Sequence, residues 1–143
     1  MQHVNKTFNP GGINEKVALQ DVSIHFQSGD VVNIIGSNGA GKTTLLNVVA
    51  GAYPADRGTI TLENREIQSF PEHIRAAEMG RVFQDPLMGT AATMTIEENL
   101  ALAMRRGTPR RIRIGITASD RRLFRERLGL LGLGLEDRLK DRV

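Results

Sequence analysis

"GSNGAGKTTLL", residues 36–46, is the stretch that decides the fold class of this chain. It fits the pattern Gly-x-x-x-x-Gly-Lys-Thr from Gly36 to Thr43, which is the spacing of a phosphate-binding loop. Glycine lacks a Cβ atom, so the backbone can curl and present its N–H groups to an anion. A helix predicted to begin at Lys42 adds the positive end of its dipole. We therefore expect the loop to hold the terminal phosphates of a nucleotide.

Two side chains of the loop have specific expected roles. Lys42 should reach the β- and γ-phosphates and is a candidate catalytic residue, while the Thr43 hydroxyl should bind Mg²⁺. A hydrogen bond to a charged group contributes roughly 1.5–3 kcal/mol, so loss of Lys42 should weaken binding strongly. The candidate nucleotide-binding residues of the loop are Gly36, Ser37, Asn38, Gly39, Ala40, Gly41, Lys42, Thr43 and Thr44.

The segments on both sides of the loop support this interpretation. "VVNII", residues 31–35, predicts a short strand covered on both faces. "KTTLLNVVA", residues 42–50, predicts a helix that ends before Gly51 and buries Leu45, Leu46, Val48 and Val49. The alternative is a surface glycine turn that happens to precede a lysine, and the strand-loop-helix context argues against it.

Further elements are predicted along the chain. "DVSIHFQSGD", residues 21–30, alternates apolar and polar residues and predicts a half-buried antiparallel strand. Strands are also predicted in "TITLEN", residues 59–64, and "RVF", residues 81–83. "FPEHIRAAEMG", residues 70–80, predicts a short helix with Pro71 in its first turn.

Two helices are predicted in the carboxy-terminal half. Thr95 and Glu98 have the spacing of a capping box at the start of one helix. Ser119 or Asp120 is expected to cap the other. Residues 105–143 carry 12 lysines and arginines against 5 acidic residues, whereas residues 1–104 carry 7 against 11.

This basic segment allows two interpretations. It could bind nucleic acid or an anionic membrane, or its arginines could solvate exposed helix faces. The arginines are not interleaved with the series of aromatic residues that single-strand binding requires, so we expect no nucleic-acid partner. The absence of cysteine excludes disulfides and thiolate metal sites and fits a reducing compartment. The amino terminus lacks a secretory signal pattern, and no apolar run approaches the roughly 20 residues of a membrane span.

A phosphate-binding loop does not by itself distinguish kinases, GTPases and transport ATPases. The stretches around it narrow the choice: residues 18–51, "DRGTITLENREI", "GRVFQDP" and "MTIEENLALA" occur in this order. Together they resemble the nucleotide-binding subunit of ABC (ATP-binding cassette) transporters. The resemblance implies an α/β P-loop NTPase fold of ABC type, with a mixed sheet, an antiparallel β subdomain and an incomplete core. It implies a nucleotide-binding core over residues 1–85 and the start of a helical subdomain over residues 86–143.

The resemblance also implies roles for residues outside the loop. Phe8 falls where the family places an aromatic residue, usually Tyr, that stacks on adenine; plain packing is the alternative. Gln84 in "VFQDP" falls on the glutamine that reaches Mg²⁺ and the attacking water, which makes it a candidate catalytic and metal-binding residue beside Thr43. Alone, such a glutamine would be a solvated surface residue. The implied cofactors are ATP and Mg²⁺.

The implied partners are a transmembrane permease, contacted by the helical part from about Thr95, and a second ATP-binding subunit. The implied location is cytoplasmic, peripheral to the cytoplasmic membrane. The chain lacks the family's LSGGQ signature, its apolar strand ending in Asp-Glu and its catalytic-site His. We therefore expect an amino-terminal portion of an ABC ATPase in which "VVNII" keeps unpaired edges. Two functions stay open: a transport ATPase subunit, or a truncated nucleotide-binding module that hydrolyses nothing.

Overall fold

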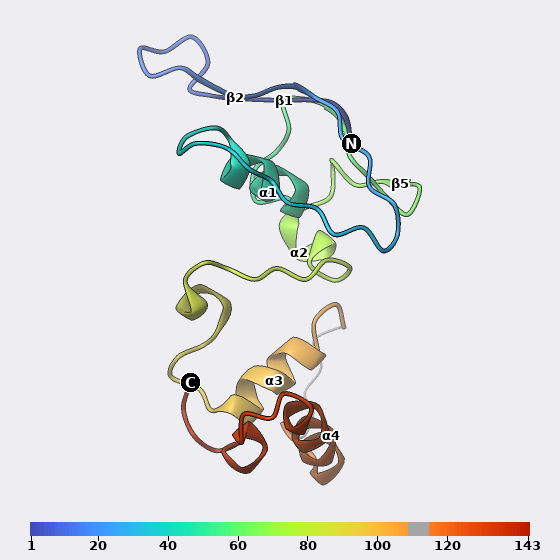
Figure 1. Cartoon of the computed structure of the whole chain (residues 1–143), viewed down its shortest axis with the longest axis vertical. Coiled ribbons are helices and arrows are strands. Elements are labelled where there is room, and N and C mark those ends of the chain that lie inside the picture. Colours follow the sequence, from blue (N-terminus) through green and yellow to red (C-terminus); the bar gives the residue numbers. More distant parts are fainter. Residues whose placement is uncertain (109–114) are drawn as a thin grey trace. The chain divides into compact units, whose positions relative to one another are not determined.

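A computed structural model describes residues 1–108 and 115–143 of the chain (Figure 1). These residues form two units, Met1–Met79 and Gly80–Val143, each with its own hydrophobic core. The predicted boundary after residue 85, between a nucleotide-binding core and a helical subdomain, stays a prediction. Within the described residues, no helix combines the length and the apolar character needed to cross a membrane.

The first unit is built on a three-stranded antiparallel sheet. The central strand β1 (Gln2–Phe8) pairs with β2 (Lys16–Val22) on one side and with β3 (Arg57–Thr59) on the other. A separate two-stranded hairpin follows, formed by β4 (Thr61–Leu62) and β5 (Arg65–Glu66). This arrangement confirms the predicted antiparallel β subdomain.

The strand predicted over residues 59–64 is divided at Ile60. The Ile60 amide donates to Gln68 Oε1 at 3.1 Å, and its carbonyl accepts from the Ile67 amide at 2.8 Å. The chain therefore changes partner at this residue, because β3 pairs with β1 whereas β4 pairs with β5.

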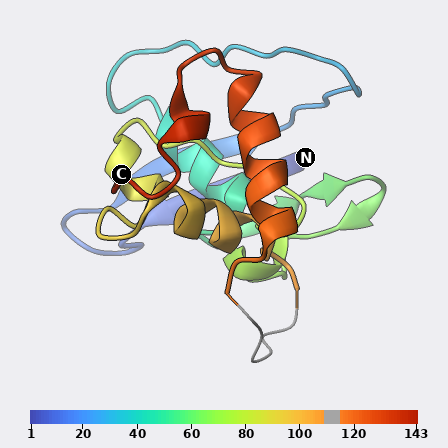
Figure 2. The ribbon, with the colours of Figure 1, turned by 90° about the horizontal axis from the view of Figure 1, so that it is seen from below.

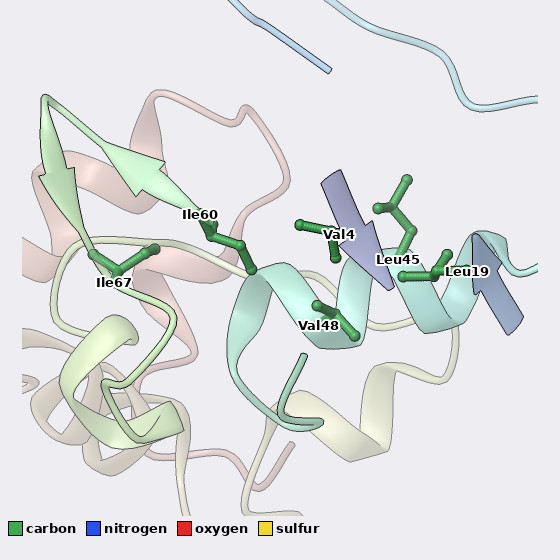
Figure 3. Packing of buried hydrophobic residues seen from close by; sticks show 6 residues of the cluster. All are labelled: Val4, Leu19, Leu45, Val48, Ile60 and Ile67. Carbon is green, nitrogen blue, oxygen red and sulfur yellow. The ribbon is translucent and has the colours of Figure 1, made fainter. Parts of the chain in front are cut away.

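Helix α1 (Lys42–Ala50) confirms the helix predicted after the glycine-rich loop. It packs on the first unit's sheet, with Val4, Leu19, Leu45, Val48, Ile60 and Ile67 forming the buried cluster (Figure 3). Leu46 was predicted to join this face, but its side chain is 54% exposed. Leu45, Val48 and Val49 follow the i, i+3, i+4 spacing of one helix face, and Leu46 falls outside it. Gly51 ends α1 at φ 88°, as its position predicted.

The strand predicted at residues 31–35 is wrong, because these residues form no strand. Val31 and Ile35 are each 92% exposed. A strand needs neighbours to satisfy its N–H and C=O groups, and none of the described strands pairs with this segment. Without partners the segment is irregular, so the expected strand with unpaired edges is not formed. The predicted strand at residues 81–83 is absent as well, and the one predicted over residues 21–30 ends at Val22.

The second unit consists mainly of helices: η1 (Pro86–Gly89), α3 (Ile96–Met104), α4 (Ala118–Gly129) and η2 (Leu135–Asp137). Helices α3 and α4 lie side by side (Figure 2), and their core contains Ala101, Phe124, Leu128 and Leu139. The end of the chain lies along the start of α3, with the Ile96 amide 2.9 Å from the Asp141 oxygen and the Glu97 amide 2.9 Å from the Leu139 oxygen.

The helix starts differ in how well they were predicted. Thr95 and Glu98 form both halves of the capping box of α3, which confirms that prediction. Thr117 caps α4, and Asp120 is its third helical residue rather than its cap, so the prediction of Ser119 or Asp120 is wrong. Helix α2 (Glu72–Arg75) is confirmed as a short helix, but Pro71 is its N-cap and not part of the first turn.

Candidate phosphate-binding site

The backbone before α1 curls as the glycine spacing predicts. Gly39 and Gly41 have φ angles of 84° and 91°, in the left-handed region that favours glycine. The Ala40 amide donates to the Ser37 oxygen at 3.2 Å, which closes the turn. A Cβ atom on Gly41 would lie 2.5 Å from the carbonyl oxygen of Ala18 in β2, so the loop can approach the sheet only with glycine here.

The Lys42 side chain folds over this loop. Its ammonium nitrogen lies 2.7 Å from the carbonyl oxygen of Gly36 and 2.8 Å from that of Ser37. An ammonium has three donors, so after these two contacts one donor remains for an anion. The predicted loop residues therefore come together as one turn with a cation held at its centre.

Backbone groups add to this positive site. Within the described part of the chain, the amides of Lys42, Thr43 and Thr44 donate to no protein oxygen, as expected for the first turn of a helix. The first turn of α1 contains no acidic residue. A second cation lies nearby, because Lys16 Nζ is 3.9 Å from the position that a Cβ atom on Gly39 would take. The arrangement suits a phosphate group, which supplies several acceptor oxygens and negative charge.

Phe8 lies at the end of β1, directly opposite Lys16 of β2. Its ring is half-buried, and Lys6 Nζ lies over it at 5.6 Å from the ring centroid. The Tyr53 ring meets it edge-on, with centroids 5.3 Å apart and an interplanar angle of 84°. Tyr53 was not predicted to be a site residue, although it is the chain's only tyrosine and lies in the short loop between α1 and β3.

The same loop is tied to β1 through Asp56. One carboxylate oxygen accepts from Lys6 Nζ at 2.8 Å, and the other accepts from the Thr7 amide at 2.6 Å. The hydrogen bond from Lys6, assisted by that from Thr7, lowers the pKa of Asp56. The Asp56 amide in turn donates to the Asn5 oxygen at 2.9 Å.

Arg75 of α2 binds the carboxy-terminal end of α1, a role that was not predicted from the sequence. Its side chain is buried, with 3% exposed, and burial lowers the pKa of its guanidinium. Nη1 donates to the carbonyl oxygens of Val48 and Val49 at 2.8 and 2.9 Å, in the last turn of the helix, where carbonyl groups lack intrahelical partners. The Val48 oxygen also accepts from the Gly51 amide at 3.3 Å. Nε and Nη2 donate to the oxygens of Phe70 and Gln68, both at 2.9 Å.

The two predicted magnesium-binding residues lie in different units. Thr43 is exposed on the first turn of α1, and its hydroxyl is the kind of hard oxygen donor that Mg²⁺ prefers. Gln84 is exposed in the second unit, immediately before Asp85, which caps η1. Its role toward the loop therefore stays a prediction. Among the residues that the structure describes, no three His, Asp or Glu side chains are grouped to hold a metal ion.

Comparison with known proteins agrees with this geometry. The family model of ABC transporters matches residues 19–142, which include the whole loop and Gln84. This chain belongs to the ABC transporter family. Phe8 lies outside the matched residues, so its expected role depends on its position at the end of β1, opposite Lys16 of β2.

Among curated ABC relatives, the tyrosine transport ATP-binding protein of Clostridioides difficile is 42% identical over 108 residues, covering 75% of this chain and 43% of that protein. The sulfate/thiosulfate import protein CysA 1 of Chromobacterium violaceum is 34% identical over 143 residues, covering 100% and 36%. The ribose import protein RbsA of Streptococcus agalactiae is 37% identical over 102 residues, covering 71% and 20%. The chain spans less than half the length of each of these relatives.

Solved ABC structures share the fold. MJ1267, an ATP-binding cassette of an ABC transporter, matches with a TM-score of 0.71 at 28% identity, covering 99% of this chain and 55% of that one. The cassette MJ0796, a dimer bound to ADP and Pi, matches with a TM-score of 0.76 at 23% identity, covering 99% and 60%. The second likeness concerns the fold alone. Both confirm the predicted α/β fold of ABC type.

Proposed function

We propose that this chain binds MgATP through its phosphate-binding loop, as part of an ABC subunit that powers solute transport through a partner permease. The observation that carries the proposal is the curled turn closed by Lys42, whose ammonium lies 2.7 and 2.8 Å from the oxygens of Gly36 and Ser37. This turn, the unpaired amides of α1 and the nearby Lys16 make a cradle for the terminal phosphates.

Each site residue has a role in this proposal. Lys42 neutralises the β- and γ-phosphates, and the exposed face of Phe8 stacks on the adenine. The Thr43 hydroxyl would bind Mg²⁺, which would neutralise phosphate charge. The proposed roles of Gln84, in the second unit, toward Mg²⁺ and the attacking water rest on the family motif alone.

The second candidate function is nucleotide binding without hydrolysis, and the lack of several family motifs in these 143 residues favours it. Without the LSGGQ signature and the Asp-Glu strand end, the 143 residues by themselves are a nucleotide-binding module that does not hydrolyse ATP. Phosphoryl transfer needs Mg²⁺ held firmly and a group that orients the water, and the acidic residues that the family adds to Thr43 and Gln84 for these tasks are absent from these 143 residues. ATP hydrolysis that drives transport would then require a subunit that also contains the LSGGQ signature and the Asp-Glu strand end.

The partners follow from the same family. We propose that a second ATP-binding subunit and a membrane permease complete the assembly, at the cytoplasmic face of the membrane. A second structure of MJ0796, a dimeric bacterial ABC transporter cassette that matches at 25% identity, supports the first partner. The names of the sulfate/thiosulfate and ribose relatives state import, which supports import here.

Two measurements on the same preparation test the proposal. MgATP should raise the melting temperature of the chain, and tripolyphosphate should raise it less. Phosphate release should stay at background, which would favour the non-hydrolysing module over a complete ATPase. A chain that is folded but shows no shift with MgATP at millimolar concentration would contradict nucleotide binding.

A further inference from the structure

Tyr53 and Asp56 connect the two ends of the candidate nucleotide site. The Tyr53 amide donates to the Asn47 oxygen of α1 at 3.2 Å, so the loop starts on the helix that follows the phosphate-binding turn. Three residues later, Asp56 binds Lys6 and Thr7 of β1, the strand that ends in Phe8. The loop at residues 53–56 therefore sets the placement of Phe8 relative to α1.

We propose that Tyr53 is a positioning residue that holds the Phe8 ring as a platform for the base, and so determines how well the site distinguishes a nucleotide from a bare polyphosphate. This inference rests on the proposed function. It adds a residue that affects binding of the base through Phe8, whereas the phosphates are bound by the loop.

The contacts around Phe8 give the physical reason. Lys6 Nζ lies over one face of the ring at 5.6 Å from its centroid, and Asp56 holds that ammonium at 2.8 Å. The perpendicular Tyr53 ring, 5.3 Å away, restricts rotation of the half-buried Phe8 side chain. A ring already held in one orientation loses less conformational entropy when a flat base stacks on it.

Removing Tyr53 should therefore affect the base and spare the phosphates. We expect Tyr53→Leu to weaken MgATP binding roughly three- to tenfold, the range of an aromatic pair. Its affinity for inorganic tripolyphosphate should not change. Tyr53→Phe keeps the ring and should bind MgATP like the original chain. Phe26→Leu removes a half-exposed aromatic ring elsewhere in the same unit and serves as the matched control.

The unmodified chain allows a test that needs no variant. Tyr53 is its only tyrosine and it has no tryptophan, so its ultraviolet emission reports on Tyr53 alone. MgATP should change this emission, whereas tripolyphosphate at saturating concentration should not. Free tyrosine amide titrated with the same nucleotide corrects for absorption by adenine.

The outcomes separate the inference from the proposed function. If MgATP binds and Tyr53 emission is unchanged, or Tyr53→Leu weakens MgATP and tripolyphosphate equally, the role of Tyr53 is wrong and nucleotide binding stands. If the folded chain binds tripolyphosphate and MgATP with equal affinity, Phe8 is no base platform and the inference fails. Absence of binding to either ligand overturns both.

Discussion

The ammonium of Lys42 lies 2.7 Å from the carbonyl oxygen of Gly36, six residues earlier in the same turn. The lysine that is expected to neutralise a phosphate thus also closes the loop that surrounds it. Binding can keep this geometry, because the third ammonium donor is left for the phosphate oxygen.

Lys42→Ala should abolish the stabilisation that MgATP provides. At a ligand concentration of about 100 times Kd this stabilisation is about 2.7 kcal/mol, and we expect less than about 1 kcal/mol in the variant. Far-UV circular dichroism should be unchanged, since Lys42 is not part of the buried core. Lys42→Arg keeps the charge but not the compact ammonium, so its stabilisation by MgATP should lie between that of the original chain and that of Lys42→Ala. A full MgATP shift in Lys42→Ala would place the nucleotide elsewhere.

Gly41→Ala should damage both stability and binding. The added Cβ atom would lie 2.5 Å from the Ala18 oxygen at a φ of 91°, so we expect a loss of roughly 1–3 kcal/mol in urea unfolding. The control is Gly80→Ala, where a Cβ atom would meet nothing within 4 Å. Equal urea midpoints for the two variants would show that the loop does not approach β2 so closely.

Arg75→Met should destabilise the first unit more than removal of any exposed arginine. Its guanidinium donates to the carbonyl oxygens of Val48 and Val49, of which the Val48 oxygen also accepts from the Gly51 amide. Loss of the buried guanidinium should therefore cost roughly 1–3 kcal/mol. Arg122→Met, at an exposed position of α4, is the control. Urea unfolding followed by circular dichroism measures the difference, and similar losses in both variants would contradict the role of Arg75.

Thr117→Ala should destabilise α4 by about 1 kcal/mol, because the Thr117 hydroxyl accepts from the Asp120 amide at the helix start. Ser119→Ala, inside the first turn, should cost much less. Thermal unfolding of the two variants distinguishes the cap found in the structure from the one that the sequence suggested. A larger loss of stability for Ser119→Ala than for Thr117→Ala would indicate that Ser119 is the cap after all.

The stability of the second unit should fall in acid partly through Glu97. Arg121 donates to both of its carboxylate oxygens, at 2.7 and 3.1 Å, and this lowers the pKa of Glu97 in the folded chain. The unfolded chain, with an ordinary glutamate pKa of about 4.3, then binds the proton more readily. The contribution is complete above that pKa and is lost as pH falls through the lower folded value.

Glu97→Gln should therefore be less stable than the original chain at pH 7 and should lose less stability on acidification. The pKa values of Glu98 and Asp120 are also lowered, by hydrogen bonds from Thr95 and Thr117, so part of the acid sensitivity remains. Urea midpoints at neutral and acidic pH provide the measurement, with Glu126→Gln of α4 as an exposed control. An unchanged pH dependence in Glu97→Gln would show that the pair with Arg121 contributes nothing.

Local features were the ones that sequence reasoning predicted correctly. The loop, α1 with Gly51 at its end, and the capping box of Thr95 and Glu98 depend on residues within a few positions of one another. The cap of α4 was misjudged although Thr117 and Asp120 have a similar spacing. The same spacing of three residues, from a threonine to an acidic residue, would have identified Thr117 as the cap.

Long-range features were predicted less well. The apolar run at residues 31–35 was expected to be a strand, but strand formation requires partners that no described strand provides. An arginine in the sequence is usually a surface residue, and only folding brings Arg75 to the carbonyl oxygen of Val48, 27 residues away. Tyr53 likewise gains its place only through contact with Phe8.

By itself, the sequence determined the phosphate-binding turn and the helix after it, because glycine spacing and backbone freedom act over a few residues. The ordered motifs around the loop, and not the loop alone, indicated membership of the ABC family. The tertiary structure decided which carbonyls Arg75 satisfies, how Tyr53 meets Phe8, and that residues 31–35 form no strand. Those outcomes depend on hydrogen-bond partners and ring contacts from distant parts of the chain, which no local pattern specifies.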